Sequence, residues 1–206
     1  VLTNFLGFKP DNDEWKTMAL ASSSKKNNLY DKKMSKLYKF TKKGFELDLS
    51  YFDYYLFDKR PNFYNKKFVS EFGEPRKPDS KLLQKHMELA GALQRAFEKI
   101  VFHLLVHVKK NGSKSDNLVL AGGAAMNCVF NGLLDKKKIF KNNFIPPWPD
   151  DLGVTIGALY LANQRSAKKK IVPKRIRSAY LGPSFTDDEI LKTLKKFKVT
   201  FQKPNN

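Results

Sequence analysis

The chain has 206 residues, 41% of them hydrophobic, a size that suits one domain or one and a half. A single cysteine excludes a disulfide framework within the chain, and because there is no signal peptide and no run of about 18 apolar residues, we expect a cytoplasmic protein without a membrane span. The formal net charge of +19 would suit a nucleic-acid-binding module, but the lysines are scattered in twos and threes without interleaved aromatics, so nucleic-acid or tRNA-associated binding is the alternative rather than the expectation.

The first predicted helix begins near Glu14, where Asp11 or Asp13 can cap it. Glu14 and Lys16 lie in its first turn. They can meet a ribose and a phosphate, or they can simply belong to a capped surface helix. A second helix is predicted for residues 29–40, because apolar side chains recur there at helical spacing.

Residues 41–44 form a predicted turn, and residues 45–52 alternate apolar and polar side chains, which indicates a half-buried strand. Tyr54, Tyr55 and Phe57 follow. They can stack on bases, but aromatics at strand spacing more often form a core, so we expect core packing. Arg76 follows a glycine and proline turn, where it can bind an anion or form a salt bridge in the loop.

The longest predicted helix begins at the N-caps Asp79 and Ser80 and ends at Gly112, with a regular apolar stripe between them. It contains His103 and His107, four residues apart on one face, which is a spacing found in metal sites. No glutamate lies between them, so a zinc-protease helix is not indicated. Their apolar neighbours favour packed or surface histidines.

The central part of the sequence predicts a strand, a tight glycine turn and a helix. An apolar run at residues 118–121 leads into Gly122 and Gly123, and small residues follow up to Asn127 and Cys128. A glycine turn lets backbone approach a phosphate or a ribose, and the helix behind it offers free N–H groups and a positive dipole end. The same turn can also serve only to pack the strand against the helix. We expect Cys128 to be a small buried residue rather than a nucleophile.

Asn131 and Gly132 are expected to end this helix, and a short strand is expected at residues 143–145. The proline-rich loop that follows places Asp150 and Asp151 in front of another helix at residues 154–164. Either carboxylate can cap the helix, or the two acids can hold a metal or the hydroxyls of a ribose.

The last part of the chain begins with residues 166–177, a basic stretch that contains proline and is expected to be a linker. Thr186 can then cap a helix together with Glu189 three residues on, which is a capping-box pattern. Residues 199–201 are expected to form a strand.

Two segments of the sequence match a known pattern: AGGAAMNC at residues 121–128 and DLGVTIGA at residues 151–158. They resemble the A-G-G-V-A-x-N-C and D-x-G-x-x-x-G-A segments of carbamoyltransferases of the nodulation and antibiotic O-carbamoyltransferase type. Further, weaker similarities follow the order of that family along nearly the whole chain. The family shares an actin-like core with the tRNA threonylcarbamoyladenosine transferases.

The resemblance implies an α/β fold. Residues 1–165 would form the C-terminal half of an actin-like ATPase (ASKHA) domain, residues 166–177 a linker, and residues 178–206 the start of a YrdC-like domain. The chain would then be a fragment of an O-carbamoyltransferase. We expect that fragment to be inactive alone, because the family's metal-binding histidines lie upstream of the region covered here and most of the second domain would be missing.

The intact enzymes that the sequence resembles make carbamoyl adenylate from ATP and carbamoyl phosphate and pass the carbamoyl group to a hydroxyl of a sugar or natural product. The resemblance implies a nucleotide site formed by Gly122, Gly123, Asn127, Glu14 and Lys16. It also implies that Asp151 binds a divalent, iron-like metal, which we do not expect the fragment to retain. No catalytic base and no acceptor follow from the sequence.

Overall fold

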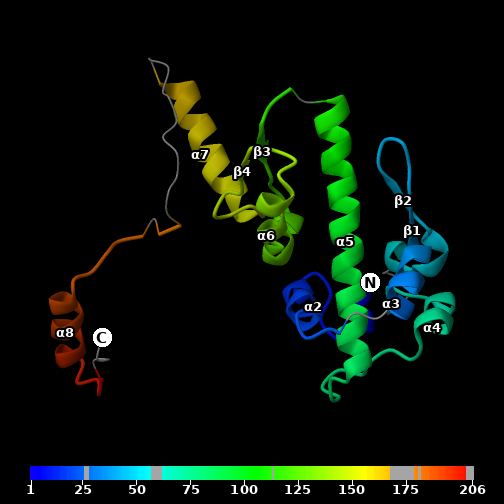
Figure 1. The fold of residues 1–206 in the computed structure, drawn as a ribbon. Helices are drawn as coiled ribbons and strands as arrows, with labels where there is room; N and C mark the ends of the chain where they lie inside the picture. The colour runs from blue at the N-terminus through cyan, green and yellow to red at the C-terminus, as the bar shows by residue number, and fades with distance from the viewer. Residues whose placement is uncertain (26–27, 57–61, 113, 168–178, 181, 203–206) are drawn as a thin grey trace. The chain divides into compact units, whose positions relative to one another are not determined.

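The computed structural model describes residues 1–25, 28–56, 62–112, 114–167, 179–180 and 182–202 (Figure 1). The chain divides into two units, Val1–Val154 and Thr155–Asn206. The described residues form a mixed α/β structure in which helices predominate and the strands pair in two small sheets. None of the described helices is long and apolar enough to span a lipid bilayer. The actin-like and YrdC-like assignments and the boundaries of the linker stay predictions, and most of residues 166–177 lies outside the described ranges.

The described elements follow one another along the chain, and helices account for most of them. In chain order they are α1 (Leu2–Phe5), α2 (Glu14–Ala21), α3 (Asn28–Met34), a 3₁₀ turn (Ser35–Leu37), β1 (Tyr38–Phe40), β2 (Phe45–Leu47), 3₁₀ turns (Leu49–Tyr51 and Tyr54–Leu56), α4 (Lys66–Phe72), α5 (Gln84–Asn111), β3 (Asn117–Val119), a 3₁₀ turn (Gly123–Met126), α6 (Cys128–Lys137), β4 (Asn142–Phe144), α7 (Leu152–Ser166) and α8 (Asp187–Lys196).

The first unit is built around α5, which has 28 residues and contacts α2 and α3 (Figure 1). Gly91 of α5 leaves room for the side chain of Ser24, which a Cβ at position 91 would overlap. Arg95, one turn further along, forms an ion pair of 2.7 Å with Asp31 of α3. The small residue and the ion pair therefore fix where α2 and α3 meet the long helix.

The start of α5 differs from the prediction. Asp79 has a left-handed φ of 60° and does not cap the helix, and the hydroxyl of Ser80 donates to the carbonyl of Lys77 at 2.8 Å. The helix begins later, at Gln84, where His86 Nδ1 accepts the N–H of Leu83 at 3.0 Å. The predicted end is confirmed, because α5 stops at Asn111, directly before Gly112.

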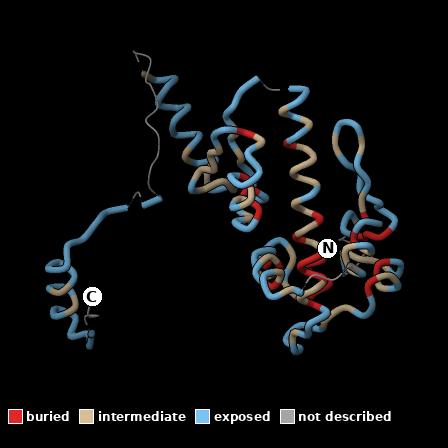
Figure 2. The backbone as a smooth tube through the Cα atoms, in the orientation of Figure 1, coloured by how far each residue is buried: buried red, intermediate tan, exposed pale blue. Residues whose placement is uncertain are grey.

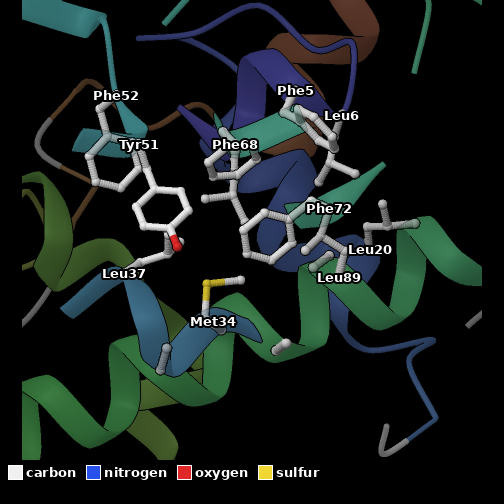
Figure 3. Close-up of a cluster of buried hydrophobic side chains, with 14 residues drawn as sticks. Phe5, Leu6, Leu20, Met34, Leu37, Tyr51, Phe52, Phe68, Phe72 and Leu89 are labelled. Atoms are coloured by element: carbon white, nitrogen blue, oxygen red, sulfur yellow. The ribbon is translucent and has the colours of Figure 1, made fainter. Parts of the chain in front are cut away.

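A first core lies where α1, α2, α3, α4 and the N-terminal half of α5 meet, and its labelled side chains point toward one another in Figure 3. Phe68 is completely buried at its centre, with ring centroids 4.9 Å from Phe5 and 4.4 Å from Phe72. Asn65 caps α4 by accepting the N–H groups of residues 67 and 68 at 3.0 and 3.2 Å. This core holds the N-terminal half of the unit together.

Arg76 fastens the loop after α4 to the N-terminal segment. Its guanidinium donates to the carbonyl of Leu6 at 2.8 Å and to the carbonyl of Ser80 at 3.0 Å from Nε, and it lies 5.3 Å from the ring centroid of Phe8. The hydrogen-bonding partners of this cation are backbone carbonyls, so no loop salt bridge of Arg76 occurs among the described residues, and anion binding by Arg76 stays a prediction.

The region after α3 is the least well predicted. The expected helix at residues 29–40 ends early, because β1 pairs antiparallel with β2 in a hairpin whose register places Phe40 opposite Phe45. Aromatic residues favour extended backbone when a partner strand is present. The strand expected at residues 45–52 is shorter and exposed. Tyr54 and Tyr55 are 42% and 56% exposed, so the prediction that they belong to the core is wrong. Phe57, the third aromatic of that prediction, lies outside the described residues.

A second core packs β3, β4 and α6 against the C-terminal half of α5. Phe130 of α6 is buried there, with ring centroids 5.6 Å from Phe97 and 4.9 Å from Phe102 of α5. Figure 2 shows buried segments on both α5 and α6. The short strand expected at residues 143–145 is confirmed as β4, and it pairs parallel with β3. Leu118 and Leu120 face this core, whereas Val119 between them is exposed.

In the second unit, the predicted capping box is confirmed. Thr186 Oγ1 accepts the N–H of Glu189 at 3.3 Å, and the carboxylate of Glu189 accepts the N–H of Thr186 at 2.7 Å, at the start of α8. Residues 199–201 do not form the expected strand, and no strand for them to pair with lies in the described part of this unit. A lone strand has no ladder to complete, so it has little reason to form.

Candidate functional site

The predicted glycine turn lies between β3 and α6 of the first unit. Gly122 has φ 97° and ψ 161°, a conformation that is essentially restricted to glycine. Its N–H donates to the carbonyl of Pro149 at 2.5 Å, and its carbonyl accepts the N–H of Ala125 at 2.9 Å. The contact with Pro149 holds the proline-rich loop against the glycine turn, two residues before Asp151.

Gly123 begins the 3₁₀ turn that follows, and the fold gives no reason for a glycine there. Its φ is not positive, and a Cβ built on it would have no described heavy atom within 4 Å. The same open space surrounds Gly122. A residue without a side chain, beside open space, exposes its backbone to anything that approaches. That arrangement leaves space for a phosphate or a ribose to approach the backbone closely.

Asn127 joins the 3₁₀ turn to α6. Its Oδ1 accepts the N–H of Phe130 at 2.9 Å and so caps the helix, while its Nδ2 donates to Gln94 Oε1 on α5 at 2.8 Å. In the opposite direction, Gln94 Nε2 donates to Asn127 Oδ1 at 3.1 Å and also to Glu98 Oε1 at 2.9 Å. The carboxamide of Asn127 is therefore bonded to α5 and to the start of α6, and its contact with a nucleotide stays a prediction.

Asn131 holds the other side of the turn. Its Nδ2 donates to the carbonyl of Ala125 at 2.7 Å, and its buried Oδ1 has no hydrogen-bond partner among the described residues. The prediction that Asn131 and Gly132 end the helix is wrong, because α6 continues to Lys137. Asn131 lies inside the helix, and its side chain connects α6 to the 3₁₀ turn through the hydrogen bond to Ala125.

The N-terminus of α6 is open to solvent. The first N–H groups of a helix have no partner within it, and Asn127 satisfies the one at Phe130. Cys128, the first residue of the helix, is exposed, which corrects the expectation that it is buried. The second core takes the side of α6 that carries Phe130 and Leu134, so Cys128 lies on another side.

Glu14 and Lys16 are engaged at the start of α2. Glu14 Oε1 accepts the N–H of Asp11 at 3.0 Å, and Lys16 Nζ forms an ion pair with Asp13 at 2.9 Å. The hydrogen bond from Lys16, together with that from the N–H of Lys9, lowers the pKa of the Asp13 carboxyl. Within the described ranges, no hydrogen bond or ion pair links Glu14 or Lys16 to the glycine turn.

Asp151 lies exposed in the turn before α7, and its carbonyl accepts the N–H of Val154 at 3.1 Å. No group of three or more histidine, cysteine, aspartate or glutamate side chains suited to a metal occurs among the residues that the structure describes. A metal at Asp151 would therefore need ligands from elsewhere.

The two histidines of α5 behave as the sequence predicts. His103 Nε2 lies 3.0 Å from the carbonyl of Thr41, and its ring centroid lies 4.5 Å from that of Phe40, so it is packed against the hairpin. His107 Nδ1 lies 3.2 Å from the side-chain amide of Asn111, one turn on. Each histidine thus has a polar partner within hydrogen-bonding distance: the carbonyl of Thr41 for His103 and the amide of Asn111 for His107.

Sequence reasoning did not assign a role to Gln94, which is only 8% exposed. The available signal was a glutamine on the inward stripe of a helix, since a buried amide needs partners for its donors and its acceptor. Which residue would supply them depends on a contact 33 positions away, and no local pattern contains that information.

Comparison with known proteins gives a consistent result. The family model described as carbamoyltransferase N-terminus matches residues 1–160. The chain is 38% identical over 207 residues to the uncharacterized protein sll1178 of Synechocystis sp., covering 94% of this chain and 31% of that protein. It is 38% identical over 119 residues to the nodulation protein NolNO of Sinorhizobium fredii, covering 56% of this chain and 17% of that protein. For the nodulation protein NolO of Bradyrhizobium diazoefficiens the figures are 34% over 107 residues, 52% and 19%. The chain thus spans about a third or less of the length of these curated relatives.

Proposed function

Because this chain belongs to the carbamoyltransferase family, through its match to the N-terminal model of that family, we propose that it forms the nucleotide-contacting part of an enzyme that transfers a carbamoyl group to a hydroxyl. One observation carries the proposal. Gly123 lies beside open space, and the fold itself does not require a glycine there. The turn that contains it is held by the hydrogen bonds of Asn127 and Asn131.

The glycine turn and the N-terminus of α6 would bind a phosphate or ribose of the nucleotide through backbone N–H groups. Anions are stabilised at a helix N-terminus by the unpaired N–H groups and by the helix dipole. The excess of lysine and arginine over acidic residues adds a positive field that favours ATP and carbamoyl phosphate. Glu14 and Lys16 stay candidates for a second contact, which would require Lys16 to exchange its ion pair with Asp13 for the ligand.

In the reaction that we propose, water releases inorganic phosphate from carbamoyl phosphate, and an oxygen of the resulting carbamate bonds to the α-phosphorus of ATP while pyrophosphate leaves, which gives carbamoyl adenylate. The hydroxyl oxygen of the acceptor, a sugar or a natural product, then forms a bond to the carbamoyl carbon, and its proton passes to solvent. The bond from that carbon to the phosphate oxygen breaks, and AMP leaves. Donors directed at the adenylate would stabilise the charge that develops during this step. Because Asp151 alone does not make a metal site among the described residues, we assign no step to a metal.

The test is calorimetric titration of the chain with ATP and with a stable adenylate analogue, comparing the wild type with Gly123→Val. We expect saturable binding by the wild type and its loss in the variant, because a branched side chain would fill the open space beside the turn. Circular dichroism of the variant checks that it folds. A folded wild type that binds neither compound, or a variant with unchanged affinity, would contradict the proposal.

A further inference from the structure

The amide pair between Gln94 and Asn127 links the glycine turn to the long helix. Gln94 is nine-tenths buried on α5, and Asn127 is the residue at which the 3₁₀ turn ends and α6 begins. The two side chains exchange hydrogen bonds of 2.8 and 3.1 Å, and Glu98 accepts the remaining N–H of Gln94 at 2.9 Å.

Only one orientation of the two amides satisfies every partner. The N–H of Phe130 requires an acceptor, so Asn127 must turn Oδ1 toward it and Nδ2 toward Gln94. Gln94 must then present Oε1 to that Nδ2, which leaves its Nε2 for Asn127 Oδ1 and for the carboxylate of Glu98. Reversing either amide would place two donors or two acceptors face to face.

Asn127 transmits this constraint to both sides of the site. Its backbone N–H donates to the carbonyl of Ala124 in the 3₁₀ turn at 3.2 Å, and its carbonyl accepts the N–H of Asn131 in α6 at 2.9 Å. α5, which carries Gln94, is fixed in turn by both cores. The conformation of the turn is thus tied to the helix that contributes side chains to both cores.

We propose that Gln94 is a positioning residue of the nucleotide site, which holds Asn127 so that the N–H groups of the glycine turn and of α6 are directed at the ligand before it binds. This inference rests on the proposed nucleotide binding. A turn that is already ordered does not lose conformational freedom on binding, and that preorganisation raises affinity. Gln94 itself does not touch the ligand.

The variant Gln94→Glu tests the idea most directly. A carboxylate there would face both Asn127 Oδ1 and the carboxylate of Glu98, so it would displace the amide of Asn127. We expect affinity for the adenylate analogue to fall by about tenfold or more. Protonation of the new carboxyl restores a donor, so the ratio of wild-type to variant affinity should shrink as the pH falls from 8 to 5. Gln84→Glu, the same charge change at the exposed start of α5, should leave affinity unchanged.

The variant Gln94→Met covers the case in which Gln94→Glu does not fold, because methionine keeps the volume and adds no charge. The side-chain amide signal of Asn127 in ¹⁵N–¹H spectra reports whether its orientation is lost in each variant. Folded Gln94 variants that bind with wild-type affinity would overturn the inference while the proposed function stands. A wild type that does not bind at all would remove the proposed function, and the positioning role with it.

Discussion

A substitution at Gly122 should separate the folding role of the glycine turn from its binding role. Gly122 has φ 97° and ψ 161°, and a Cβ there would meet no described atom within 4 Å. The effect of Gly122→Ala is therefore backbone strain rather than a clash. Such a conformation in a residue other than glycine costs about 1–3 kcal/mol. If the backbone instead relaxes, the strain is relieved but the hydrogen bond to Pro149 is lost, which costs roughly 0.5–1.5 kcal/mol in its place.

The matched control is Gly123→Ala, one residue along the chain. Gly123 has no positive φ and equally open surroundings, so alanine there should leave the free energy of unfolding unchanged or raise it by about 0.4–1 kcal/mol. The two variants thus differ in stability although each adds one methyl group at the same turn. Nucleotide binding should be weakened in Gly123→Ala despite its stability.

Urea denaturation measures this difference. The chain has two tryptophans, so a Trp15→Phe background leaves Trp148 as the only one. Trp148 lies half-buried in the loop that Gly122 contacts through Pro149, and its emission reports on unfolding of this region. If Gly122→Ala were no less stable than Gly123→Ala, the conformational argument for Gly122 would be refuted.

Two further predictions concern the first core. Gly7→Ala should destabilise the protein by about 1–3 kcal/mol in urea denaturation, because Gly7 has φ 73° and a Cβ there would lie 2.6 Å from the carbonyl oxygen of Arg76; an unchanged midpoint would contradict this. Burial, aided by Lys85 and Arg76, lowers the pKa of His86 from its ordinary 6.5, so the folded state favours the neutral ring that accepts the N–H of Leu83. This contribution to stability is present above pH 6.5 and is lost as the pH falls below it, so the urea midpoint should drop between pH 7.5 and 5 more in the wild type than in His86→Gln.

Several features were predictable because they depend on a few neighbouring residues. The apolar run before Gly122 predicted a strand and a turn, and the regular stripe predicted the longest helix up to Gly112. Thr186 and Glu189 predicted their own capping box. In each case the backbone preference or the hydrogen-bond partner lies within about one turn of the chain.

Other features were mispredicted because they depend on which face of an element meets a neighbour. Cys128 is small and apolar, but it is exposed because the second core takes the face of α6 that carries Phe130. Residues 38–40 continue a helical pattern, yet they form a strand because Phe45–Leu47 pairs with them. Asn131 was predicted to end the helix. Instead, its side-chain amide donates to the carbonyl of Ala125 and connects the helix to the turn before it.

The sequence by itself determined the family of this protein and the position of its glycine turn, since both are written in short runs such as AGGAAMNC at residues 121–128. Only the tertiary structure decided how the turn is held. The pair of Gln94 and Asn127 joins residues 33 positions apart, and the contact of Gly122 with Pro149 joins two loops. The physical reason is that a buried amide or an unpaired N–H must find a partner in space, and the packing of the whole unit determines which residue that is.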